Sequence, residues 1–544
     1  MRYRILILSM MVCSAILPAQ AQNAGIPHLE RHGTATQLVV DGKPFLLLGA
    51  ELHNSSSSSL DYMHSLWPQL AAIPLNTVLT PLSWELIEPQ EGKFDFTLLD
   101  GLIQEARRNN LHLVLLWLAS WKNGMSSYVP VWVKQNAHRF PRVIERDRGA
   151  VEILSPLGKE SQEADARAFA AVMRHIHEVD GDAHTVLMMQ VENEVGVLGD
   201  SRDRSSTANE AFYGQVPKEL MAYLLQHRDA LVPELRRVWE AAGSKASGTW
   251  EEVFDPGAET DKIFMAWNYA RYIQHVAAAG KAEYSIPMYV NAWLAGPHAT
   301  PGEYPSGGPL PEVMDAWKAA GTAIDIYSPD IYARNFPEWC DRYDRSGNPL
   351  FIPETRGGAL GGSNIFYALG QHQVMGFSAF GIDNLPGEVP PPLTEPDPNN
   401  DLGKSYGVLQ SLAPVILQHE GKGEIAGFLL EQDHPQTTVE LNGYRLDVRL
   451  DELFGAQAKT GFGLIIALGP DEFLGAGIGF RVAFSRREPG PSHVGIGSID
   501  EGTYFAGAWV PGRRLNGDEN DQGRYWRFSA SRISIEKAVV YHYE

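Results

Sequence analysis

The segment that decides the fold is residues 185–194, which read TVLMMQVENE. It begins as a nearly continuous apolar run, which is typical of a parallel strand that is buried on both faces. It ends in Glu192, Asn193 and Glu194. The segment therefore predicts a buried strand that delivers acidic side chains to one edge of a parallel sheet.

Seven similar runs occur between Leu38 and about Gly421, separated by longer amphipathic stretches such as residues 160–179. Alternation of this kind is the signature of βα repeats. Eight repeats predict an α/β fold, a (β/α)8 TIM barrel over residues 30–420. Residues 38–45 predict a hairpin with an Asp41-Gly42 turn before the barrel, and residues 196–285 predict additional helices over one barrel face. The eight predicted strands are residues 45–50, 77–83, 113–119, 186–191, 287–292, 324–328, 350–353 and 377–382.

After about Gly423 the pattern changes to a strict alternation of apolar and polar residues, as in residues 444–450. A period of two with many Gly, Asn and Pro turns predicts strands. We therefore expect a C-terminal all-β, sandwich-like domain at residues 421–544. The Pro-rich acidic stretch 386–401 falls between the eighth strand and its helix, and is predicted to be a loop on the barrel top.

The chain has 544 residues and a net charge of −21, with 44% hydrophobic and 20% charged residues. This composition is that of a folded globular protein, and its acidity argues against a nucleic-acid partner. Residues 1–21 resemble an export signal, with Arg2 and Arg4 before an apolar run and an Ala19-Gln20-Ala21 cleavage site. No later segment reaches the roughly 18 apolar residues of a membrane span. We expect an exported protein, periplasmic or secreted, with no membrane partner.

Active sites of βα barrels lie at the carboxyl ends of the strands, so polar residues there are informative. Glu194 ends the fourth apolar run and Glu354 follows the seventh. The ends of strands four and seven face one cavity, although the two residues are far apart in sequence. A pair of facing carboxyl groups, one protonated and one ionised, is what glycoside hydrolysis requires.

The chain resembles glycoside hydrolase family 35, the β-galactosidases, over about residues 35–420, and in particular its bacterial members with a β-rich C-terminal module. Four sequence motifs carry the resemblance. They are Asp41-Gly42-Lys43-Pro44-Phe45 leading to Gly49 and His53, Asn76-Thr77-Val78 to Trp84 with Glu88-Pro89 and Gly92-x-Phe94-Asp95-Phe96, Gln190-Val191-Glu192-Asn193-Glu194-Val195-Gly196, and Pro353-Glu354.

The resemblance implies a retaining exo-β-glycosidase, a β-galactosidase that releases terminal β-galactosyl residues from oligo- or polysaccharides. Glu194 would be the general acid/base and Glu354 the nucleophile. Asn193 would bond the 2-hydroxyl of the sugar, and Tyr332 would donate a hydrogen bond that keeps Glu354 ionised.

The sequence also departs from the family 35 pattern at positions that line the sugar pocket. Val195 stands where the family has a tyrosine, and Asn54 follows His53 in place of an aromatic residue. Another β-glycosidase of the same clan is therefore the nearest alternative.

Aromatic residues at strand ends predict the walls of sugar subsites, because the C–H faces of sugars pack on indole rings. The candidates are Trp84, Trp121 and Trp293. Polar residues near the same ends are candidates for contacts with sugar hydroxyls. These are Glu51, Glu88, Lys122, Asn123 and Asn291.

Two other functions fit parts of the sequence. The glycine-rich segment 355–362 follows the seventh strand, where many barrels bind phosphate, so a phosphate-binding barrel enzyme is one alternative. A non-catalytic glycan-binding protein would explain the aromatic residues but not both glutamates. No cluster of metal ligands is visible in the sequence, so neither a metal nor an organic cofactor is expected. The oligomeric state and the role of the C-terminal domain stay open.

Overall fold

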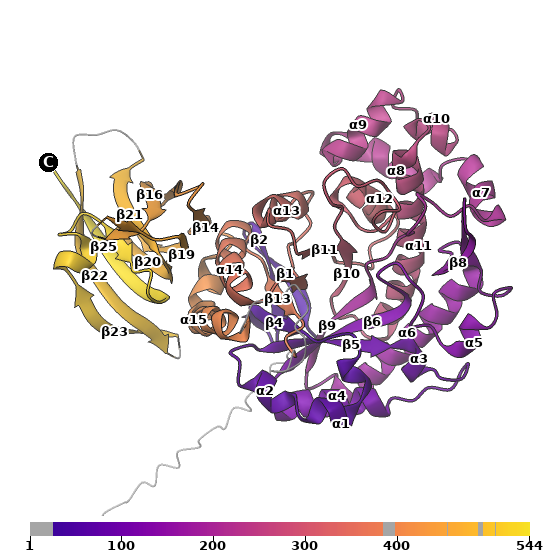
Figure 1. The fold of residues 1–544 in the computed structure, drawn as a ribbon, viewed down its shortest axis with the longest axis horizontal. Coiled ribbons are helices and arrows are strands. Elements are labelled where there is room, and N and C mark those ends of the chain that lie inside the picture. The colour runs from indigo at the N-terminus through magenta and orange to yellow at the C-terminus, as the bar shows by residue number, and fades with distance from the viewer. Residues whose placement is uncertain (1–24, 384–397, 454, 488–492, 506) are drawn as a thin grey trace, which may run out of the picture.

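A computed structural model describes residues 25–383, 398–453, 455–487, 493–505 and 507–544. It has two parts, a large βα barrel and a smaller β module that packs beside it (Figure 1). The predicted export signal, residues 1–21, lies outside the described residues, as does most of the predicted loop 386–401. The last residues of that stretch begin helix α15.

The barrel is a sheet of eight parallel strands in the order β12-β11-β10-β9-β6-β5-β4-β13. A parallel bridge from Ile352 to Phe377 joins the two ends of this order. The strands are β4 Leu47–Glu51, β5 Thr77–Ser83, β6 His112–Lys122, β9 Val186–Asn193, β10 Met288–Trp293, β11 Ile326–Ile331, β12 Glu354–Thr355 and β13 Gly376–Phe380.

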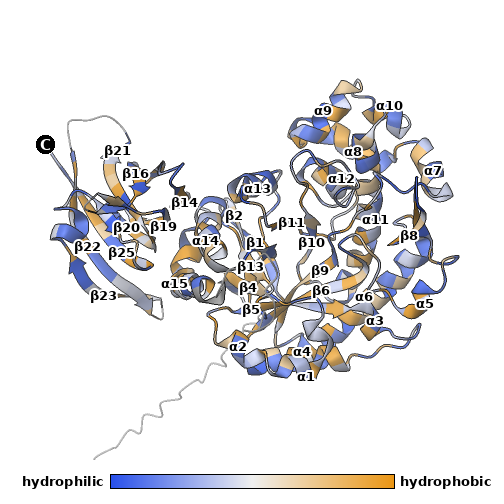
Figure 2. Ribbon diagram, viewed as in Figure 1, coloured by the Kyte–Doolittle hydropathy of each residue, from blue (hydrophilic) through white to orange (hydrophobic). Residues whose placement is uncertain are grey.

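All eight predicted strands are confirmed in position, because every apolar run lies in or directly beside a barrel strand. The seventh differs in detail. Residues 350–353 precede β12 and are bonded to β13, with the Ile352 N–H donating to Gly376 O and the Ser378 N–H donating to Ile352 O. Regular pairing with β11 begins only at Glu354. The barrel strands are coloured mainly as hydrophobic in Figure 2, as expected for strands covered on both faces.

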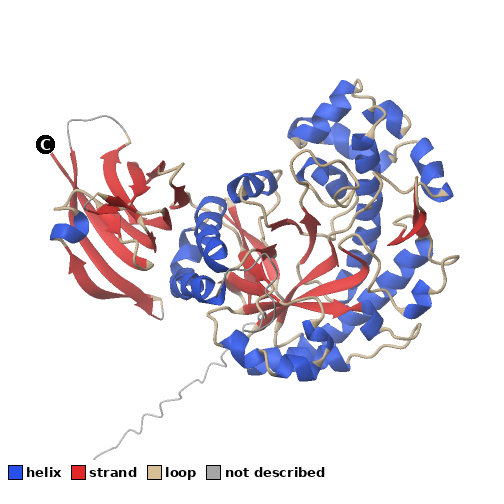
Figure 3. Ribbon diagram, in the orientation of Figure 1, coloured by secondary structure: helices blue, strands red, loops and turns tan. Residues whose placement is uncertain are grey.

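Helices cover the outside of the barrel (Figure 3). The predicted helix at residues 160–179 is α6, which packs along α11. The predicted extra helices of residues 196–285 are also present. Within the described residues, no helix combines the length and apolarity that crossing a membrane requires. The helices are α1 Leu60–His64, α2 Trp67–Ala71, α3 Trp84–Ile87, α4 Thr97–Arg108, α5 Val131–Lys134, α6 Lys159–Asp180, α7 Ser206–Tyr213, α8 Lys218–Gln226, α9 Pro233–Ala241, α10 Trp250–Phe254, α11 Ala258–Glu283, α12 Met314–Ala319, α13 Phe336–Tyr343, α14 Gly358–His372 and α15 Pro398–His419, with 3-10 turns η1 Ser56–Ser58, η2 Arg228–Ala230, η3 Pro311–Val313 and η4 Gly517–Asn520.

A hairpin closes the amino-terminal end of the barrel. Strands β2 (Ala35–Val40) and β3 (Lys43–Phe45) are joined by Asp41 and Gly42, both at positive φ, which confirms the predicted turn. Leu38 and Val40 are buried against side chains that fill the barrel interior. The opposite end of the barrel is the one that carries the acidic strand ends. Outside the barrel lie β1 His28–His32, which pairs with β2, and the antiparallel pair β7 Arg142–Glu145 and β8 Gly149–Leu154.

The C-terminal residues form antiparallel sheets, as predicted. Sheets of six and four strands enclose a separate apolar core that includes Phe480, Trp526 and Phe528. The six-stranded sheet has the order β14 Ile425–Glu431, β19 Thr460–Gly469, β20 Glu472–Ile478, β25 Ser534–Tyr543, β22 His493–Phe505 and β23 Ala508–Leu515. The four-stranded sheet has the order β15 Gln436–Leu441, β16 Tyr444–Leu450, β21 Phe480–Arg486 and β24 Trp526–Phe528, and β17 Glu452–Leu453 pairs with β18 Ala456–Gln457.

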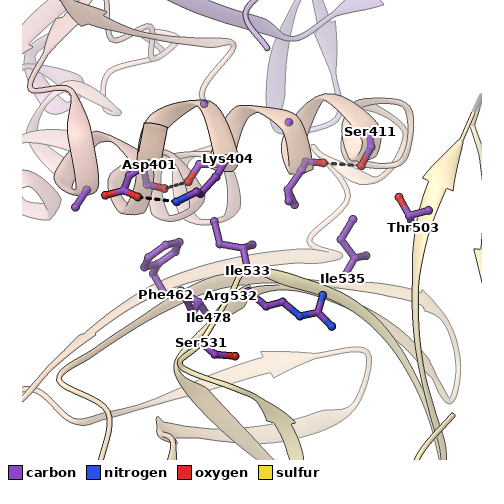
Figure 4. A pocket seen from close by; sticks show the side chains of 16 residues that line it. Asp401, Lys404, Ser411, Phe462, Ile478, Thr503, Ser531, Arg532, Ile533 and Ile535 are labelled. Carbon is purple, nitrogen blue, oxygen red and sulfur yellow. Dashed lines mark hydrogen bonds and ion pairs between the residues drawn. The ribbon is translucent and has the colours of Figure 1, made fainter. Parts of the chain in front are cut away.

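Helix α14 joins the two parts by packing on β14 and β19. Phe366 of α14 meets Phe462 of β19 with ring centroids 5.3 Å apart. Near this contact a cavity of about 630 Å³ lies between α14, the first half of α15 and the β module (Figure 4). Its lining is mixed, with apolar residues such as Ile533 and Ile535 beside the charged Lys404 and Arg532.

Two glycines, Gly370 of α14 and Gly427 of β14, form a tight contact between the two parts, and this contact can be tested by substitution. A Cβ on Gly370 would lie 2.3 Å from the Gly427 nitrogen, so Gly370→Ala must push α14 away from β14. We expect a loss of about 1–3 kcal/mol in the free energy of unfolding, measured by urea or thermal denaturation. Gly407→Ala in α15 is the matched control, since its Cβ would lie 3.6 Å from Pro74, an ordinary contact. The control should be neutral or up to about 1 kcal/mol more stable. Equal stability of the two variants would contradict the tight contact.

Candidate active site

Three acidic side chains meet at the carboxyl end of the barrel. One carboxylate oxygen each from Glu194, Asp330 and Glu354 lies within 4.8 Å of the other two. Glu194 directly follows β9, and Asp330 of β11 pairs with Glu354 of β12. All three residues are buried. The barrel thus brings together the two glutamates that the sequence singled out and adds Asp330, which the sequence analysis did not identify.

Glu194 is held by two asparagines on neighbouring strand ends. Its backbone N–H donates to Asn291 Oδ1 at 3.0 Å. Its carboxylate Oε2 accepts a hydrogen bond from Asn123 Nδ2. Both Glu194 and Asn123 have positive φ values, 44° and 50°, which non-glycine residues rarely adopt. The backbone is therefore strained at the position that sets the direction of the Glu194 side chain.

The carboxyl group of Glu194 is poised to titrate near neutrality. Burial, followed by the negative charge of Glu354, raises its pKa to about 7. Lys122 opposes this rise, since its ammonium group favours the ionised carboxylate. A group that exchanges its proton near pH 7 suits general acid and base chemistry.

Glu354 has a different environment. The predicted hydrogen bond from Tyr332 is present, with the phenol donating to Glu354 Oε1. Burial and the Glu354 charge raise the pKa of Tyr332, so the phenol keeps its proton and remains a donor. Oε2 of Glu354 has no donor among the described residues. This oxygen is available to a bound molecule.

Glu51, the last residue of β4, adds a fourth carboxyl group. It is 1% exposed, and neither of its carboxyl oxygens has a donor among the described residues. Burial, and then the charge of Glu354, raises the pKa of Glu51 well above its ordinary value, while Lys122 lowers it. Glu51 and Lys122 therefore both face the acidic cluster, as their positions at strand ends predict.

Asn193 ends β9, immediately before Glu194. Its side chain is fully buried, yet neither Nδ2 nor Oδ1 has a hydrogen-bond partner among the described residues. Buried side-chain amides normally form hydrogen bonds, so the lack of a partner for Asn193 among the described residues needs an explanation. A polar ligand in the barrel mouth would supply the partner.

A second pair of carboxyl groups lies beneath the site, formed by Glu192 and by Asp165, which the sequence analysis did not identify. Glu192 accepts hydrogen bonds from the backbone N–H groups of Ser120 and Trp121, at 3.0 and 2.7 Å. Asp165 of α6 accepts from the Ser120 hydroxyl at 2.6 Å and interacts with Glu192, whose pKa burial raises. These bonds hold the irregular part of β6 that leads to Lys122. The signal in the sequence was an acid inside an otherwise apolar strand.

The prediction that Trp84 and Trp121 form subsite walls is wrong. Both side chains are fully buried. Trp84 Nε1 donates to Glu88 Oε2 at 2.8 Å, and Trp121 Nε1 donates to Leu154 O at 3.0 Å. The Trp121 ring is enclosed by Tyr269 and Tyr272, with centroids 4.9 and 4.6 Å away. Trp293, in contrast, is 41% exposed at the end of β10 and stays a candidate.

Glu88 and Asn291 are also corrected. Glu88 is buried, and its carboxylate accepts from Trp84 and from the Gly92 N–H at 2.7 Å, so it stabilises a loop and does not face a sugar. Asn291 accepts from the Glu194 N–H and donates from Nδ2 to Asp330 Oδ2 at 2.7 Å. Its amide positions two acids in place of the predicted contact with a sugar hydroxyl.

The glycine-rich segment after β12 starts helix α14 at Gly358. Arg356 Nε donates to the backbone oxygen of Tyr332 at 2.9 Å, which ties the loop after β11 to the loop after β12. A cavity of about 440 Å³ adjoins these loops and is lined by Tyr332, Arg356 and residues of β14 and β19, including Glu431.

Among the described residues, the acidic trio Glu194, Asp330 and Glu354 is the group whose geometry could hold a metal ion. Carboxylate oxygens suit hard cations such as Ca²⁺ or Mg²⁺. Each of the three groups also accepts a hydrogen bond from a neutral donor, namely Asn123, Asn291 or Tyr332.

Comparisons with known proteins find similarity to β-galactosidases over part of the chain. Residues 69–284 match glycoside hydrolase family 42, described as beta-galactosidase, and residues 402–527 match a domain of unknown function, DUF5597. Family 42 is related to family 35 but distinct from it. The match thus supports the coarser resemblance to β-galactosidases and not the specific family that the motifs suggested.

Two curated relatives are similar over part of their length. A beta-galactosidase of Xanthomonas manihotis is 29% identical over 177 residues, 30% of this chain and 26% of that protein. Beta-galactosidase 11 of Arabidopsis thaliana is 25% identical over 174 residues, 30% of this chain and 18% of that protein. The matched regions thus span about a quarter or less of these relatives.

Two solved structures are also similar to this chain. The catalytic domain of a beta-amylase from Paenibacillus polymyxa has a TM-score of 0.47 at 12% identity and covers 66% of this chain and 97% of that one. A beta-galactosidase from Rahnella sp. R3 has a TM-score of 0.45 at 15% identity and covers 68% of this chain and 57% of that one.

The electrostatic coupling within the site predicts a specific titration. Glu354→Gln removes the negative charge that helps to raise the pKa of Glu194 to about 7, so that pKa should fall. Carboxyl-carbon NMR of labelled glutamates across pH measures it. Glu420 is an internal control, because burial alone raises its pKa to about 7 and Gln37 is its hydrogen-bond partner. The Glu420 titration should not move. An unchanged Glu194 titration in Glu354→Gln would contradict the coupling.

Proposed function

We propose that this protein is a retaining exo-β-glycosidase, a β-galactosidase that releases terminal β-galactosyl residues from oligo- or polysaccharides. A carbohydrate is the proposed partner. Another β-glycosidase of the same clan is the nearest alternative, since Val195 and Asn54 depart from the family 35 pattern. The family 42 match and the β-galactosidase relatives support the activity.

One observation carries the proposal. Two glutamates at the ends of strands four and seven have carboxylate oxygens within 4.8 Å of each other, and their environments differ. Burial and the Glu354 charge raise the pKa of Glu194 to about 7, whereas Glu354 accepts a hydrogen bond from the Tyr332 phenol. Retaining glycosidases place these groups about 5–5.5 Å apart, and inverting ones about 6.5–9.5 Å apart to admit a water. The close pair favours retention.

In the first step Glu194 would protonate the glycosidic oxygen while a Glu354 oxygen attacks the anomeric carbon. The bond to the leaving group breaks, and the sugar becomes esterified to Glu354. Oε2 of Glu354 lacks a donor among the described residues, so it is the oxygen we assign to attack. Tyr332 holds the other oxygen and fixes the orientation of the carboxylate.

In the second step water attacks the anomeric carbon, and Glu194 accepts its proton. Esterification neutralises Glu354, which removes the second-largest cause of the raised Glu194 pKa. The Glu194 pKa therefore falls when a base is needed and rises again when Glu354 is released. The coupling of two close carboxyl groups thus lets one residue serve as acid and then as base.

The remaining strand-end residues are proposed to bind the sugar. Asn193 offers an unsatisfied amide for the 2-hydroxyl, a contact that strengthens in the transition state. Glu51 and Lys122 interact electrostatically with each other, and Glu51 also with Glu194 and Glu354. Trp293 presents an exposed indole for the sugar or its aglycone. Asn123 acts through Glu194, to which it donates.

We also propose the finer placement in family 35, which is supported by the Trp84 to Phe96 block together with Asn193-Glu194. Export to the periplasm or medium is proposed on the basic, apolar and small-residue pattern of residues 1–21.

The stereochemistry of the product tests the close carboxyl pair. Hydrolysis of an aryl β-galactoside, followed by proton NMR, should first show the β anomer, because two displacements retain configuration. The reaction is run with and without EDTA, and equal rates are expected because the carboxyl groups themselves carry the chemistry. A first-formed α anomer would overturn the role of Glu354. Loss of turnover in EDTA that a divalent ion restores would instead assign the acidic trio to a cation.

The two glutamates should respond differently to substitution. Glu354→Ala removes the nucleophile and should abolish turnover of every substrate. Glu194→Ala should lose about 10²–10⁴ in rate on a natural galactoside but retain glycosylation by a dinitrophenyl galactoside, whose leaving group needs no proton. The glycosyl-enzyme should then accumulate, and azide should accelerate turnover to a β-galactosyl azide.

Glu420→Gln is the control for this comparison, since it removes another buried carboxyl group whose pKa is about 7 but lies outside the acidic cluster. It should keep full activity. Equal losses of Glu194→Ala on both substrates, without azide rescue, would show that Glu194 is not the acid/base. Glu192 is then the next carboxyl group to examine, although its oxygens bond Ser120 and Trp121.

A further inference from the structure

Asp330 is the member of the acidic trio to which the proposed mechanism gives no task. It lies at the end of β11, is 3% exposed, and has an oxygen within 4.8 Å of both Glu194 and Glu354. Its Oδ2 accepts a hydrogen bond from Asn291 Nδ2 at 2.7 Å. Its Oδ1 is buried and has no donor among the described residues. Oδ2 of Asp330 is thus held by Asn291, whereas Oδ1 has no donor among the described residues.

Asn291 makes the position of Asp330 depend on that of Glu194. The same side chain accepts from the Glu194 N–H at 3.0 Å and donates to Asp330. The amide of Asn291 cannot rotate to exchange its two ends without breaking both bonds, because the N–H of Glu194 needs an acceptor and Oδ2 of Asp330, as an acceptor, needs a donor. Asp330 is therefore built into the support of Glu194.

The charges around Asp330 disfavour a further anion. The carboxyl groups of Glu354, Glu194 and Glu51 face it from β12, the end of β9 and β4, and the phenols of Tyr289, Tyr332 and Tyr343 face it from β10, the loop after β11 and α13. Lys122 of β6 faces Glu194 and Glu51. Burial, and then the Glu354 and Glu194 charges, raises the pKa of Asp330 well above its ordinary value.

We propose that Asp330 is a positioning residue that carries a proton through the working pH range and donates it in a hydrogen bond to the carboxylate of Glu194. This inference rests on the proposed glycosidase function. The bond stabilises Glu194 in its ionised form and holds the carboxylate at the position from which it accepts a proton from water. No covalent bond changes at Asp330, and its proton stays on it throughout the cycle.

The activity of Asp330→Asn should differ according to whether Asp330 is a protonated donor or an anion. Asp330→Asn keeps an acceptor for Asn291 and a donor for Glu194 without a charge, so it mimics the protonated acid. Asp330→Ala removes the donor. If the inference is right, Asp330→Asn keeps kcat/KM within about threefold of wild type, with the alkaline limb of the pH profile within about half a unit. Asp330→Ala should lose about 10- to 100-fold, the usual effect of deleting a hydrogen bond to a charged group.

A readout that does not require activity accompanies the kinetics. The infrared difference spectrum of wild type minus Asp330→Asn at pH 7 should show the C=O band of a protonated carboxyl group. Asp330→Ala replaces Asp330→Asn in this subtraction if thermal unfolding shows that the amide variant is not folded. Asp315→Asn is the matched control, because Asp315 is also a buried aspartate but accepts from Val232 and Tyr223 and does not face Glu194. It should match wild type in activity.

Each outcome decides between the two states of Asp330. Carboxylate bands in place of the C=O band, or an alkaline limb that moves to lower pH in Asp330→Asn, would show an ionised Asp330 and overturn the inference. Equal activity of the Asn and Ala variants would also overturn it, since the donor would then do nothing. If wild type hydrolyses no aryl glycoside, the proposed function fails, and the infrared spectrum still decides whether Asp330 is protonated.

Discussion

The main constraint on this structure is that several carboxyl groups are buried close together, where their negative charges repel. Four carboxyl groups, from Glu51, Glu194, Asp330 and Glu354, share one buried end of the barrel with Lys122. Two unit charges 4.8 Å apart repel by roughly 3 kcal/mol at an effective dielectric constant of 20. Burial, and then the charge of Glu354, raises the pKa of Glu194 to about 7. Repulsion and burial together thus decide which groups hold protons, and therefore which can act as acid, base or nucleophile.

The barrel can hold these carboxyl groups close together because residues outside the cluster form hydrogen bonds that keep the neighbouring backbone in place. Glu192 and Glu194 both adopt positive φ values, 63° and 44°, and such strain costs of order 1–3 kcal/mol per residue. Backbone N–H groups of Ser120 and Trp121 bind Glu192 and offset part of this cost. Asn291 does the same for the Glu194 backbone. Polar residues beneath the site therefore maintain a backbone that the sequence at Glu194 would not adopt alone.

The sequence predicted the barrel well because burial on both faces leaves a strong pattern. Each of the eight apolar runs lies at a barrel strand, strand ends identified Glu194 and Glu354, and the family resemblance implied the role of Tyr332. The tryptophans were not predictable in the same way. A tryptophan after a strand can point into the mouth or turn under a helix, and Trp121 does the latter because Leu154 O and two tyrosines surround it. Such contacts come from segments that are distant in the sequence, so the local sequence pattern cannot predict them.

Asp330 shows a case in which more could have been predicted. Residues two apart on a strand share a face, so Tyr332, directly after β11, implied that Asp330 points to the same side of the sheet as Tyr332. Asp330 was not identified because it follows Pro329 and belongs to none of the motifs that carry the family resemblance. Asn291 could not have been assigned in advance, since its role depends on the spacing of β9, β10 and β11 in space. The alternation of side chains along a strand thus predicts which of them point into a site. Their hydrogen-bond partners can be identified only from the folded sheet, because they lie on other strands.

The β module is part of the support of the site and not a separate attachment. Helix α14 begins at Gly358, four positions after Glu354, and its far end meets β14 at the contact between Gly370 and Gly427. Arg356, between the nucleophile and the helix, bonds to the backbone of Tyr332, which in turn donates to Glu354. A shift of α14 against the module would therefore act on the loop that holds both the phenol and the carboxylate. Because the cavity beside Tyr332 is lined by β14 and β19 as well as by barrel loops, the module also shapes the surface next to the nucleophile.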